Sequence, residues 1–361
     1  MSLSLTKIGN NNYQYNRSSS IKYLKLQNVM SSRYNNNNCL ITPSGMAAID
    51  LAFNTIFIEN KWTTINIIYS WELYYESPEL FEYYKKIYSN IQINLFEISI
   101  ISSENDNEFI IDLFKNQVNN QINILFVESC SNDRGWFIDI DIIKEIRSLS
   151  KKLYFIIDNT WLTSVIFNPF RYDVDIVVTS LSKHYSGGLC IGGAILIKNK
   201  NSYNILNELY KNKGYYVSDI ICDIILQNIK KMNDRLIKTS QIANKIANYL
   251  KTHNKITQVS YPLLKKHSSY RLKEKFFFKK IDNELLGPDI FSFEINENKN
   301  ILIKKLINMN ILNYKTSYGG KDSRIDPSPI EINVNKTFIR ISIGYNDNYE
   351  RIIKGIEEIL G

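Results

Sequence analysis

The sequence predicts an α/β fold, in which a mostly parallel sheet flanked by helices is followed by a smaller α+β domain. From Cys39 onward, apolar runs of strand length alternate with stretches of helical spacing, the order that crossover connections between parallel strands produce. Most runs are apolar nearly throughout, as expected of strands that are buried on both faces. After a long helical stretch from Ile220 to Asn254, the pattern becomes that of a second, smaller domain.

The first 38 residues are polar and rich in Asn, Ser and Tyr. We expect them to form an extended arm that includes a helix through Ile21–Val29 and ends in a loop at Asn35–Asn38. A chain of 361 residues is long enough for one large domain or two modest ones. We therefore assign residues 1–38 to an N-terminal arm, 39–239 to a large domain and 240–361 to a C-terminal small domain.

The large domain is expected to contain six strands and the helices that connect them. The predicted strands are Ile65–Tyr69, Ile93–Ile98, Ile122–Val127, Leu153–Ile157, Ile176–Val178 and Gly193–Ile197. The predicted helices are Gly45–Phe57, Pro78–Ser89, Ile140–Leu149 and Ser202–Asn212. The run from Ile93 is the weakest strand, because Asn94 and Glu97 interrupt it.

The small domain is expected to combine four strands with two helices. The predicted strands are Ile256–Tyr261, Ile290–Ile295, Ile332–Val334 and Phe338–Ser342, and the helices are Asn300–Asn308 and Asn348–Leu360. The stretch from Ile220 to Asn254 reads as one long helix that bridges the two domains.

Composition argues against several classes of protein. No run of about 18 apolar residues occurs, and residues 1–10 lack an apolar core of signal-peptide length, so we expect a cytosolic protein. The net charge is +8, but the lysines are scattered among acids, which favours a solvated basic face over a nucleic-acid surface. The four cysteines form no C-x-x-C pair and only three histidines are present. Buried free thiols are therefore preferred to a disulfide framework or a metal site.

Two residues at predicted strand ends suggest the chemistry. Asp158 ends the strand Leu153–Ile157, and Lys183 follows the strand Ile176–Val178. Open parallel sheets bind ligands outside the carboxyl ends of their strands, so both side chains could point into one crevice. Pyridoxal phosphate (PLP) needs this pair, because its aldehyde forms a Schiff base with a lysine and its pyridine nitrogen needs an acidic partner.

The same region offers donors for the phosphate of this cofactor. They are the hydroxyls of Ser180 and Ser182 and the backbone N–H groups where the loop Thr42–Ala48 enters a helix. Plainer interpretations stay open, since a lone Asp at a strand end or a lone Lys in a loop is often structural or solvated. The glycine cluster Gly187–Gly193 fits neither a Walker loop nor a strand–GxGxxG–helix order, so a nucleotide site is not favoured.

A series of short motifs connects the chain to a known family. The motifs are, in chain order, Tyr15-Asn16-Arg17, Pro43-Ser44-Gly45-Met46-Ala47-Ala48-Ile49, Glu128-Ser129-Cys130-Ser131-Asn132, Asp158-Asn159-Thr160, Ser180-Leu181-Ser182-Lys183, Val259-Ser260-Tyr261-Pro262-Leu263-Leu264, Ser317-Tyr318-Gly319-Gly320 and Arg340-Ile341-Ser342-Ile343-Gly344. In this order and spacing, the chain resembles the Cys/Met metabolism family of PLP enzymes of fold type I. That family includes cystathionine γ-synthase, the cystathionine β- and γ-lyases, methionine γ-lyase and O-acetylhomoserine sulfhydrylase.

The resemblance implies a set of cofactor contacts. Lys183 would form the Schiff base and then move protons, and Asp158 would bind the pyridine N–H. The cofactor would be held further by Ser44, Gly45, Met46, Thr160, Ser180 and Ser182. Tyr74 matches the tyrosine that stacks on the cofactor ring, with Tyr75 as the alternative. Tyr15 and Arg17 would reach the phosphate from a neighbouring subunit, so the resemblance implies a homodimer or homotetramer with shared active sites.

The resemblance also implies how an amino-acid substrate is bound. Arg340 would grip the α-carboxylate, a role that suits its planar fork, and Ser317 would assist. Asn132 would bind either the cofactor 3′-oxygen or the substrate carboxylate. Plainer roles stay open here too: Ser44 as a helix cap, Asn132 as a turn residue and the tyrosines as core.

The implied activity is transsulfuration-type chemistry at Cγ or Cβ of a sulfur-containing or O-acylated amino acid, through an external aldimine and a quinonoid. Position 316 is Thr, where many γ-acting members carry Glu and β-lyases carry Tyr, so β- and γ-chemistry both stay open, with γ slightly ahead. The cysteine associated with methionine γ-lyase is absent beside Tyr74, which counts against that activity. The alternatives are a specialised γ-substitution in secondary metabolism and a non-catalytic scaffold.

Overall fold

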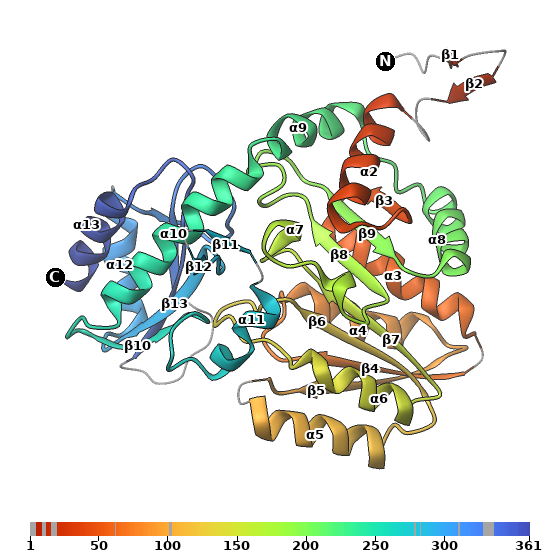
Figure 1. The fold of residues 1–361 in the computed structure, drawn as a ribbon, viewed down its shortest axis with the longest axis horizontal. Helices are drawn as coiled ribbons and strands as arrows, with labels where there is room; N and C mark the ends of the chain where they lie inside the picture. The colour runs from red at the N-terminus through yellow and green to blue at the C-terminus, as the bar shows by residue number, and fades with distance from the viewer. Residues whose placement is uncertain are drawn as a thin grey trace.

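The computed structural model describes residues 5–8, 12–15, 20–61, 63–100, 103–277, 279–281, 283–309, 311–327 and 336–361. Within these ranges, no helix is both long and apolar enough to cross a membrane. Figure 1 shows the C-terminal elements gathered on one side of the molecule, with α10 (Met232–Leu250) running between them and the larger sheet.

A seven-stranded sheet flanked by helices forms the larger part of the molecule, as predicted. Its strands lie in the order β3-β9-β8-β7-β6-β4-β5. The bounds are β3 (Cys39–Thr42), β4 (Thr64–Ser70), β5 (Gln92–Ile98), β6 (Ile122–Glu128), β7 (Lys152–Asp158), β8 (Ile176–Ser180) and β9 (Gly193–Ile197). The five strands from β8 to β5 are parallel, while β9 runs antiparallel to both of its neighbours.

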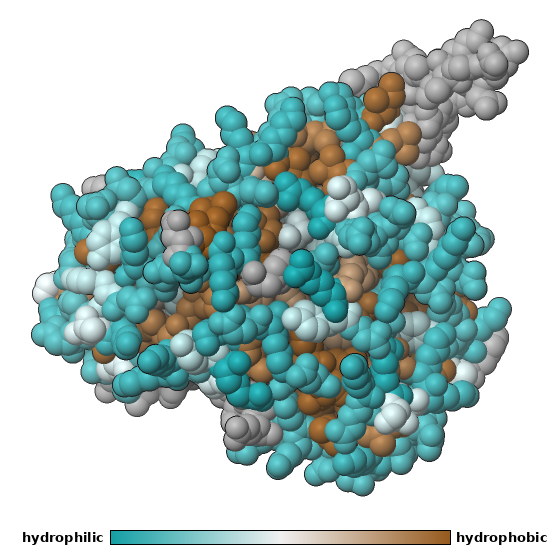
Figure 2. Space-filling view, viewed as in Figure 1, coloured by the Kyte–Doolittle hydropathy of each residue, from teal (hydrophilic) through white to brown (hydrophobic). Residues whose placement is uncertain are grey.

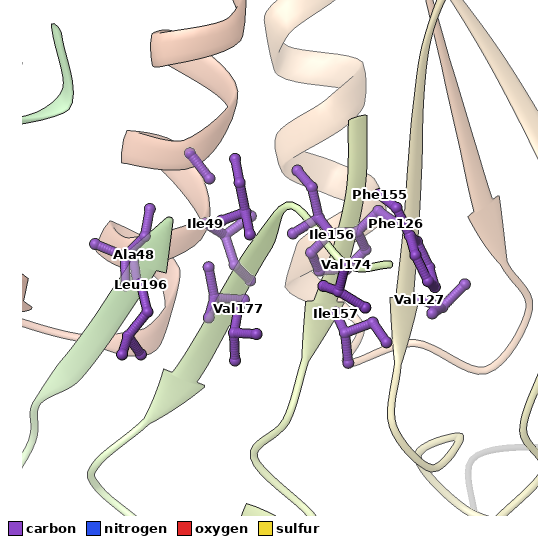
Figure 3. Close-up of a cluster of buried hydrophobic side chains, with 14 of the residues drawn as sticks. Ala48, Ile49, Phe126, Val127, Phe155, Ile156, Ile157, Val174, Val177 and Leu196 are labelled. Carbon is purple, nitrogen blue, oxygen red and sulfur yellow. The ribbon is translucent and has the colours of Figure 1, made fainter. Parts of the chain in front are cut away.

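The described helices associated with this sheet are α2 (Ile21–Tyr34), α3 (Gly45–Glu59), α4 (Glu76–Ile87), α5 (Ser103–Asn116), α6 (Ile143–Leu149), α7 (Thr163–Ile166), α8 (Lys200–Asn212) and α9 (Asp219–Ile229). Figure 3 shows Ala48 and Ile49 of α3 close to Leu196 of β9 and Val177 of β8. This apolar contact fixes the first turn of α3 on the sheet beside the strand ends that carry the candidate site.

A second sheet of five strands occupies the C-terminal part, in the order β10-β13-β16-β15-β14. Its strands are β10 (Ile256–Ser260), β13 (Ile290–Ile295), β14 (Asn313–Tyr314), β15 (Arg324–Pro327) and β16 (Thr337–Ser342), and its helices are α12 (Lys299–Ile307) and α13 (Tyr349–Leu360). Shorter elements are β1 (Leu5–Ile8), β2 (Asn12–Tyr15), α11 (Lys273–Phe276), β11 (Lys280–Ile281) and β12 (Glu284–Leu285). The predicted strand Ile332–Val334 lies outside the described residues.

Three sequence predictions need correction. The stretch from Ile220 to Asn254 is two helices, because the chain turns at Lys230–Lys231 between α9 and α10. Strand β3 and helix α5 were not predicted. The first is only four residues at a sheet edge, and the polar first half of the second hides its helical periodicity. The interrupted run from Ile93 is nevertheless a strand, and its polar residues are explained by the edge position of β5.

Two separate clusters of buried apolar side chains fill the molecule. The helix predicted over Ile21–Val29 extends to Tyr34, and its buried side chains join the first cluster. Along α10, Met232 and Leu236 belong to the first cluster and Ile242 to the second. This change of partner is the reason we propose a domain boundary near residue 240.

Candidate active site

A cavity of about 1130 Å³ lies where the carboxyl ends of the parallel strands meet the second sheet. It is lined by every predicted site residue whose side chain the structure describes: Ser44, Gly45, Met46, Tyr74, Asn132, Asp158, Thr160, Ser180, Ser182, Lys183, Ser317 and Arg340. Tyr75 lines it as well. Arg17 and the side chain of Tyr15 lie outside the described residues, so their roles remain predictions.

Asp158 is the last residue of β7 and presents a carboxylate to the cavity. Its Oδ1 accepts hydrogen bonds from the backbone N–H of Thr160, at 2.9 Å, and from the Thr160 hydroxyl. Burial raises the pKa of Asp158 to about 6, while Thr160 and the charge of Lys183 act in the opposite direction. A buried carboxylate of this kind is stabilised by a cationic partner, which a protonated pyridine nitrogen provides.

Lys183 enters the cavity from the loop after β8. Its Nζ donates a hydrogen bond to Ser317 Oγ at 3.0 Å and lies 5.3 Å from the centre of the Tyr318 ring. Burial is the main cause that lowers the pKa of Lys183, and the nearby guanidinium groups of Arg340 and Arg324 lower it further. A lysine with a lowered pKa is more often neutral near pH 7, so it can act as a nucleophile and accept a proton.

The start of α3 forms a tight cradle against β8 and β9. Ser44 caps the helix by accepting a hydrogen bond from the N–H of Ala47 at 3.1 Å, so its plainer interpretation as a cap is correct. A Cβ on Gly45 would lie 3.0 Å from Ser180 Cβ, and one on Gly193 would lie 2.1 Å from the Ser44 carbonyl oxygen. The space at Gly193 excludes any side chain and that at Gly45 is tight. This close approach brings the first N–H groups of α3 beside Ser180, an arrangement suited to an anion.

The two serines near this cradle differ in their hydrogen bonds. Ser182 Oγ donates to the carbonyl oxygen of Gly192 at 3.1 Å and accepts from its N–H at 3.0 Å. Ser180 Oγ accepts from the N–H of Ser182 at 3.3 Å, and no acceptor for its own hydrogen is found among the described residues. Ser180 is therefore better prepared than Ser182 to donate to an anion.

Tyr74 lies in the loop between β4 and α4. Its N–H donates to Glu128 Oε1 at 2.6 Å, which fixes the loop on the end of β6. The Tyr75 side chain, 65% exposed, turns its hydroxyl to Glu76, whereas Tyr74 is only partly exposed. Tyr74 is therefore the better candidate for packing on a ring inside the cavity.

Arg340 reaches the cavity from the middle of β16. Its Nη1 donates to Asn132 Oδ1 at 2.7 Å, and its Nη2 donates to Thr316 Oγ1 at 2.6 Å. Asp326, its cross-strand neighbour on β15, has Oδ2 3.5 Å from Nη2. The guanidinium is thus not an unpaired charge, and its fork is held toward the cavity by groups from three separate segments.

Sequence reasoning missed the residues that support this site. Glu72 has a positive φ of 60° and forms an ion pair of 3.0 Å with Arg134, both side chains being almost fully buried. The Glu72 carbonyl oxygen accepts from the N–H of Asn132 at 2.7 Å, so this pair holds the Tyr74 and Asn132 loops together. Glu128 lies beside Asp158 in register, and burial is the main cause that raises its pKa. Only the occurrence of Glu128 in a family motif signals it in the sequence.

Comparisons with known proteins agree with this arrangement. The family model described as Cys/Met metabolism PLP-dependent enzyme matches residues 3–360. A chloroplastic mimosinase of Mimosa pudica is 27% identical over 265 residues, which are 69% of this chain and 57% of that protein's length. A cystathionine β-lyase of Coxiella burnetii is 24% identical over 353 residues, covering 96% of this chain and 84% of the relative.

Among solved structures, the cystathionine γ-synthase of Xanthomonas oryzae pv. oryzae in complex with cystathionine has a similar fold. The TM-score is 0.82 at 20% identity, with 99% of this chain and 90% of that chain covered. The residues around the cavity also fit the cofactor, since they supply a lysine, a buried carboxylate and an anion cradle. The chain therefore belongs to the Cys/Met metabolism family of PLP-dependent enzymes.

Proposed function

We propose that this enzyme acts at Cγ or Cβ of cystathionine or an O-acylhomoserine, with γ-elimination or γ-replacement slightly favoured over β-elimination. The observation that carries the proposal is that Lys183, Asp158 and Arg340, from three different strands or strand ends, line one cavity. A general base and a carboxylate-binding arginine around one bound cofactor are what an amino-acid-transforming PLP enzyme needs.

PLP, when bound, supplies an aldehyde to which an amine can add and a protonated ring that accepts the electrons released at Cα. In this proposal Asp158 holds the proton on the ring nitrogen, and Thr160 orients Asp158 through its two hydrogen bonds. The N–H groups of Gly45 and Met46 and the hydroxyl of Ser180 would bind the phosphate, and the hydroxyl of Ser182 would join them by turning from the Gly192 carbonyl. Ser44 shapes this cradle as the helix cap, and Tyr74 packs on the ring.

Lys183 would hold the cofactor through its amine, and that amine would also move the proton at Cα of the substrate. Its lowered pKa, caused first by burial, favours the neutral amine that this step requires. Ser317 holds the Nζ atom at 3.0 Å from its hydroxyl, on the side of the cavity where Arg340 lies. For γ-chemistry, Lys183 is also the base within reach for the second proton, at Cβ.

Arg340 binds the α-carboxylate of the substrate, and Asn132 orients the guanidinium through its 2.7 Å contact. We expect Arg340→Ala to raise KM and to lower kcat/KM by at least about tenfold, because a charge-assisted bidentate contact contributes about 1.5 kcal/mol or more. Steady-state kinetics on the best substrate measure this. An unchanged kcat/KM would remove Arg340 from the substrate site.

A substrate panel tests the proposal itself. Purified enzyme is assayed with cystathionine, O-succinylhomoserine, O-acetylhomoserine and methionine, each with and without an added thiol. The readouts are release of keto acid and release or consumption of thiol. We expect turnover of cystathionine or of an O-acylhomoserine. Mimosine belongs in the panel because a relative is a mimosinase. Its leaving group is on Cβ, so turnover of mimosine alone would contradict the proposed substrates and the preference for γ-chemistry. A colourless protein that takes up no cofactor would support the scaffold alternative.

Thr316 bears on the choice between β- and γ-chemistry. Its hydroxyl is used as an acceptor for Arg340, and it offers neither a carboxylate nor a phenol to a leaving group. The identity of the leaving group must therefore be decided by other residues that line the outer cavity, which include Glu76, Lys299 and Lys315.

We further propose that two copies of the chain share their active sites. Apolar side chains gather on the surface over α2 and α9 (Figure 2), where Ile21, Leu24 and Ile220 are exposed and a groove separates the two helices. In the sequence, this surface begins at Ile21, a few residues after Tyr15 and Arg17. An exposed apolar patch of this kind is typical of a subunit interface.

Mixing of variants tests the shared site. We expect Arg17→Ala to weaken retention of PLP about tenfold, because it removes a charged phosphate contact. Co-refolding of Arg17→Ala with Lys183→Ala subunits should give more activity at limiting PLP than the two variants give separately, since one of the two sites then has both residues. Failure of the mixture, with mixed dimers demonstrated by mass, would place Arg17 in its own subunit's site or outside any site.

A further inference from the structure

His184, the residue after Lys183, points away from the cavity into the contact between the two sheets. Its Nε2 lies 3.5 Å from Asp289 Oδ1, and the two side chains are 4% and 2% exposed. Neither atom has a hydrogen-bond partner among the described residues. Each of these two buried polar atoms is therefore the available partner of the other, and a change that moved them apart would remove that partner from both.

Asp289 is itself firmly attached to the C-terminal part of the chain. Its Oδ2 accepts from the hydroxyl of Thr239 on α10 at 2.8 Å, and its carbonyl oxygen accepts from the N–H of Ile343 at 2.9 Å. It directly precedes β13, which pairs with β16, the strand that carries Arg340. Any shift of Asp289 relative to His184 would therefore be accompanied by a shift of the second sheet, which carries Arg340.

Near this contact, the backbone at Gly319 lies directly against the backbone of Lys183 and His184. Gly319 has φ +71°, and a Cβ there would lie 2.6 Å from the His184 nitrogen and 2.7 Å from the Lys183 carbonyl carbon. Ser317, which accepts the hydrogen bond from Lys183 Nζ, is a non-glycine residue held at φ +84°. Such strain persists only where surrounding contacts enforce it. The segment Ser317–Gly320, from the C-terminal part of the chain, is thus in close contact with Lys183 and His184.

The groups around the pair are few. Arg235 Nη2 donates to the His184 carbonyl oxygen at 2.9 Å, and the ring of Tyr318 lies 5.4 Å from the imidazole. Burial is the main cause that lowers the pKa of His184 and raises the pKa of Asp289, while each partner opposes the shift of the other. Arg235 and Lys183 are the other charges that act on the imidazole.

We propose that His184 and Asp289 are positioning residues, which set Lys183 at a fixed distance from Arg340. The inference rests on the proposed function, in which Arg340 holds the α-carboxylate and Lys183 moves the proton on the adjacent Cα. Lys183 and Arg340 belong to different sheets, so the contact between the sheets decides whether the amine reaches that proton. Misplacement of a reacting group by about 1 Å can lower a rate about 100-fold.

The test compares apolar and conservative variants of the pair. We expect His184→Phe and Asp289→Leu to retain the visible absorbance band of bound PLP but to shift the pH midpoint of that band by at least about half a unit, because the Nζ environment changes. In both variants kcat should fall about 10- to 100-fold, with KM within about threefold of wild type. His184→Gln keeps an N–H donor near the position of Nε2 and should have the wild-type band midpoint and kcat. The double variant His184→Phe/Asp289→Leu should have a kcat no lower than that of either single variant.

Asp347→Leu serves as the matched control, because Asp347 is an equally buried carboxyl of the same sheet region that accepts from Ser323 and Arg351 and does not contact the lysine segment. An unshifted band and unchanged kcat in the folded single variants would overturn the proposal, as would equal losses in the control. If the apolar variants fail to fold, His184→Ala, which removes Nε2 without adding bulk, must still shift the band midpoint, and an unshifted midpoint there overturns the proposal as well. A wild-type protein without a visible band would instead contradict the proposed function.

Discussion

Lys183→Ala is expected to abolish the visible absorbance band of PLP-loaded enzyme and to lower kcat by at least about 10²- to 10⁴-fold. In the proposed site, the change removes both the amine that would hold the cofactor and the base that would move the proton at Cα, and a positioned base alone contributes a factor of this size. Spectra of the variant incubated with PLP, together with turnover of the best substrate from the panel, measure both effects.

Lys198→Ala is a suitable control for this experiment. Lys198 is 59% exposed and pairs with Asp173 on the surface at 3.1 Å. Its loss should change neither spectrum nor rate, because an exposed ion pair contributes little. If Lys183→Ala retained the band at wild-type intensity, another lysine would hold the cofactor and the proposed site would be wrong.

Asp158→Asn is expected to lower kcat about 10²- to 10³-fold while the protein still binds PLP. The amide keeps an oxygen that can accept from Thr160, but it cannot hold the proton on the ring nitrogen by charge, and loss of one preorganised electrostatic contact costs a rate factor of this order. A variant with wild-type kcat would show that the ring is oriented differently in the cavity.

The same variant has an opposite expected effect on the stability of the cofactor-free protein. Burial raises the pKa of Asp158 to about 6 in the folded chain, whereas an unfolded Asp titrates near 3.9. Because the folded pKa is the higher one, ionisation opposes folding, and this destabilisation grows as the pH rises from about 4 to 6 and is complete above that range.

Without cofactor at pH 8, the unfolding free energy of Asp158→Asn should therefore exceed that of wild type by about 1–3 kcal/mol, and its thermal midpoint should be higher. At pH 4 the two midpoints should be similar. Saturation with PLP should reverse the order at pH 8, because only the carboxylate gains a cationic partner. A wild-type protein that is the more stable one at pH 8 without cofactor would indicate another buried cation beside Asp158.

The alternation of apolar runs and helical stretches was sufficient to predict the α/β class and most strands of the large sheet. Strand β9 has the predicted bounds, and β6 and β7 differ from them by only one or two residues at their ends. These strands are buried on both faces, so their local pattern is unambiguous. The missed elements, β3 and α5, lack such a pattern, since one is short and the other is polar over its first turns.

In the candidate site, too, some residues could be predicted from the sequence and others could not. Asp158 and Lys183 could be placed at one edge of the sheet from their positions after two strands, since parallel strands bring their carboxyl ends together. The Glu72–Arg134 pair and the Asp326 contact of Arg340 had no comparable signal. The first joins segments 62 residues apart, the second depends on the register of two paired strands, and the residue types alone suit many surface positions.

The sequence by itself determined the fold class, the family to which the chain is similar and the chemical groups available for PLP. The tertiary structure alone decided which of those groups meet: Lys183 with Ser317, Arg340 with Asn132, and His184 with Asp289. Local patterns record how each segment buries its own apolar face, whereas these contacts depend on how two separately formed sheets pack against each other, and that packing is set by many weak contacts at once.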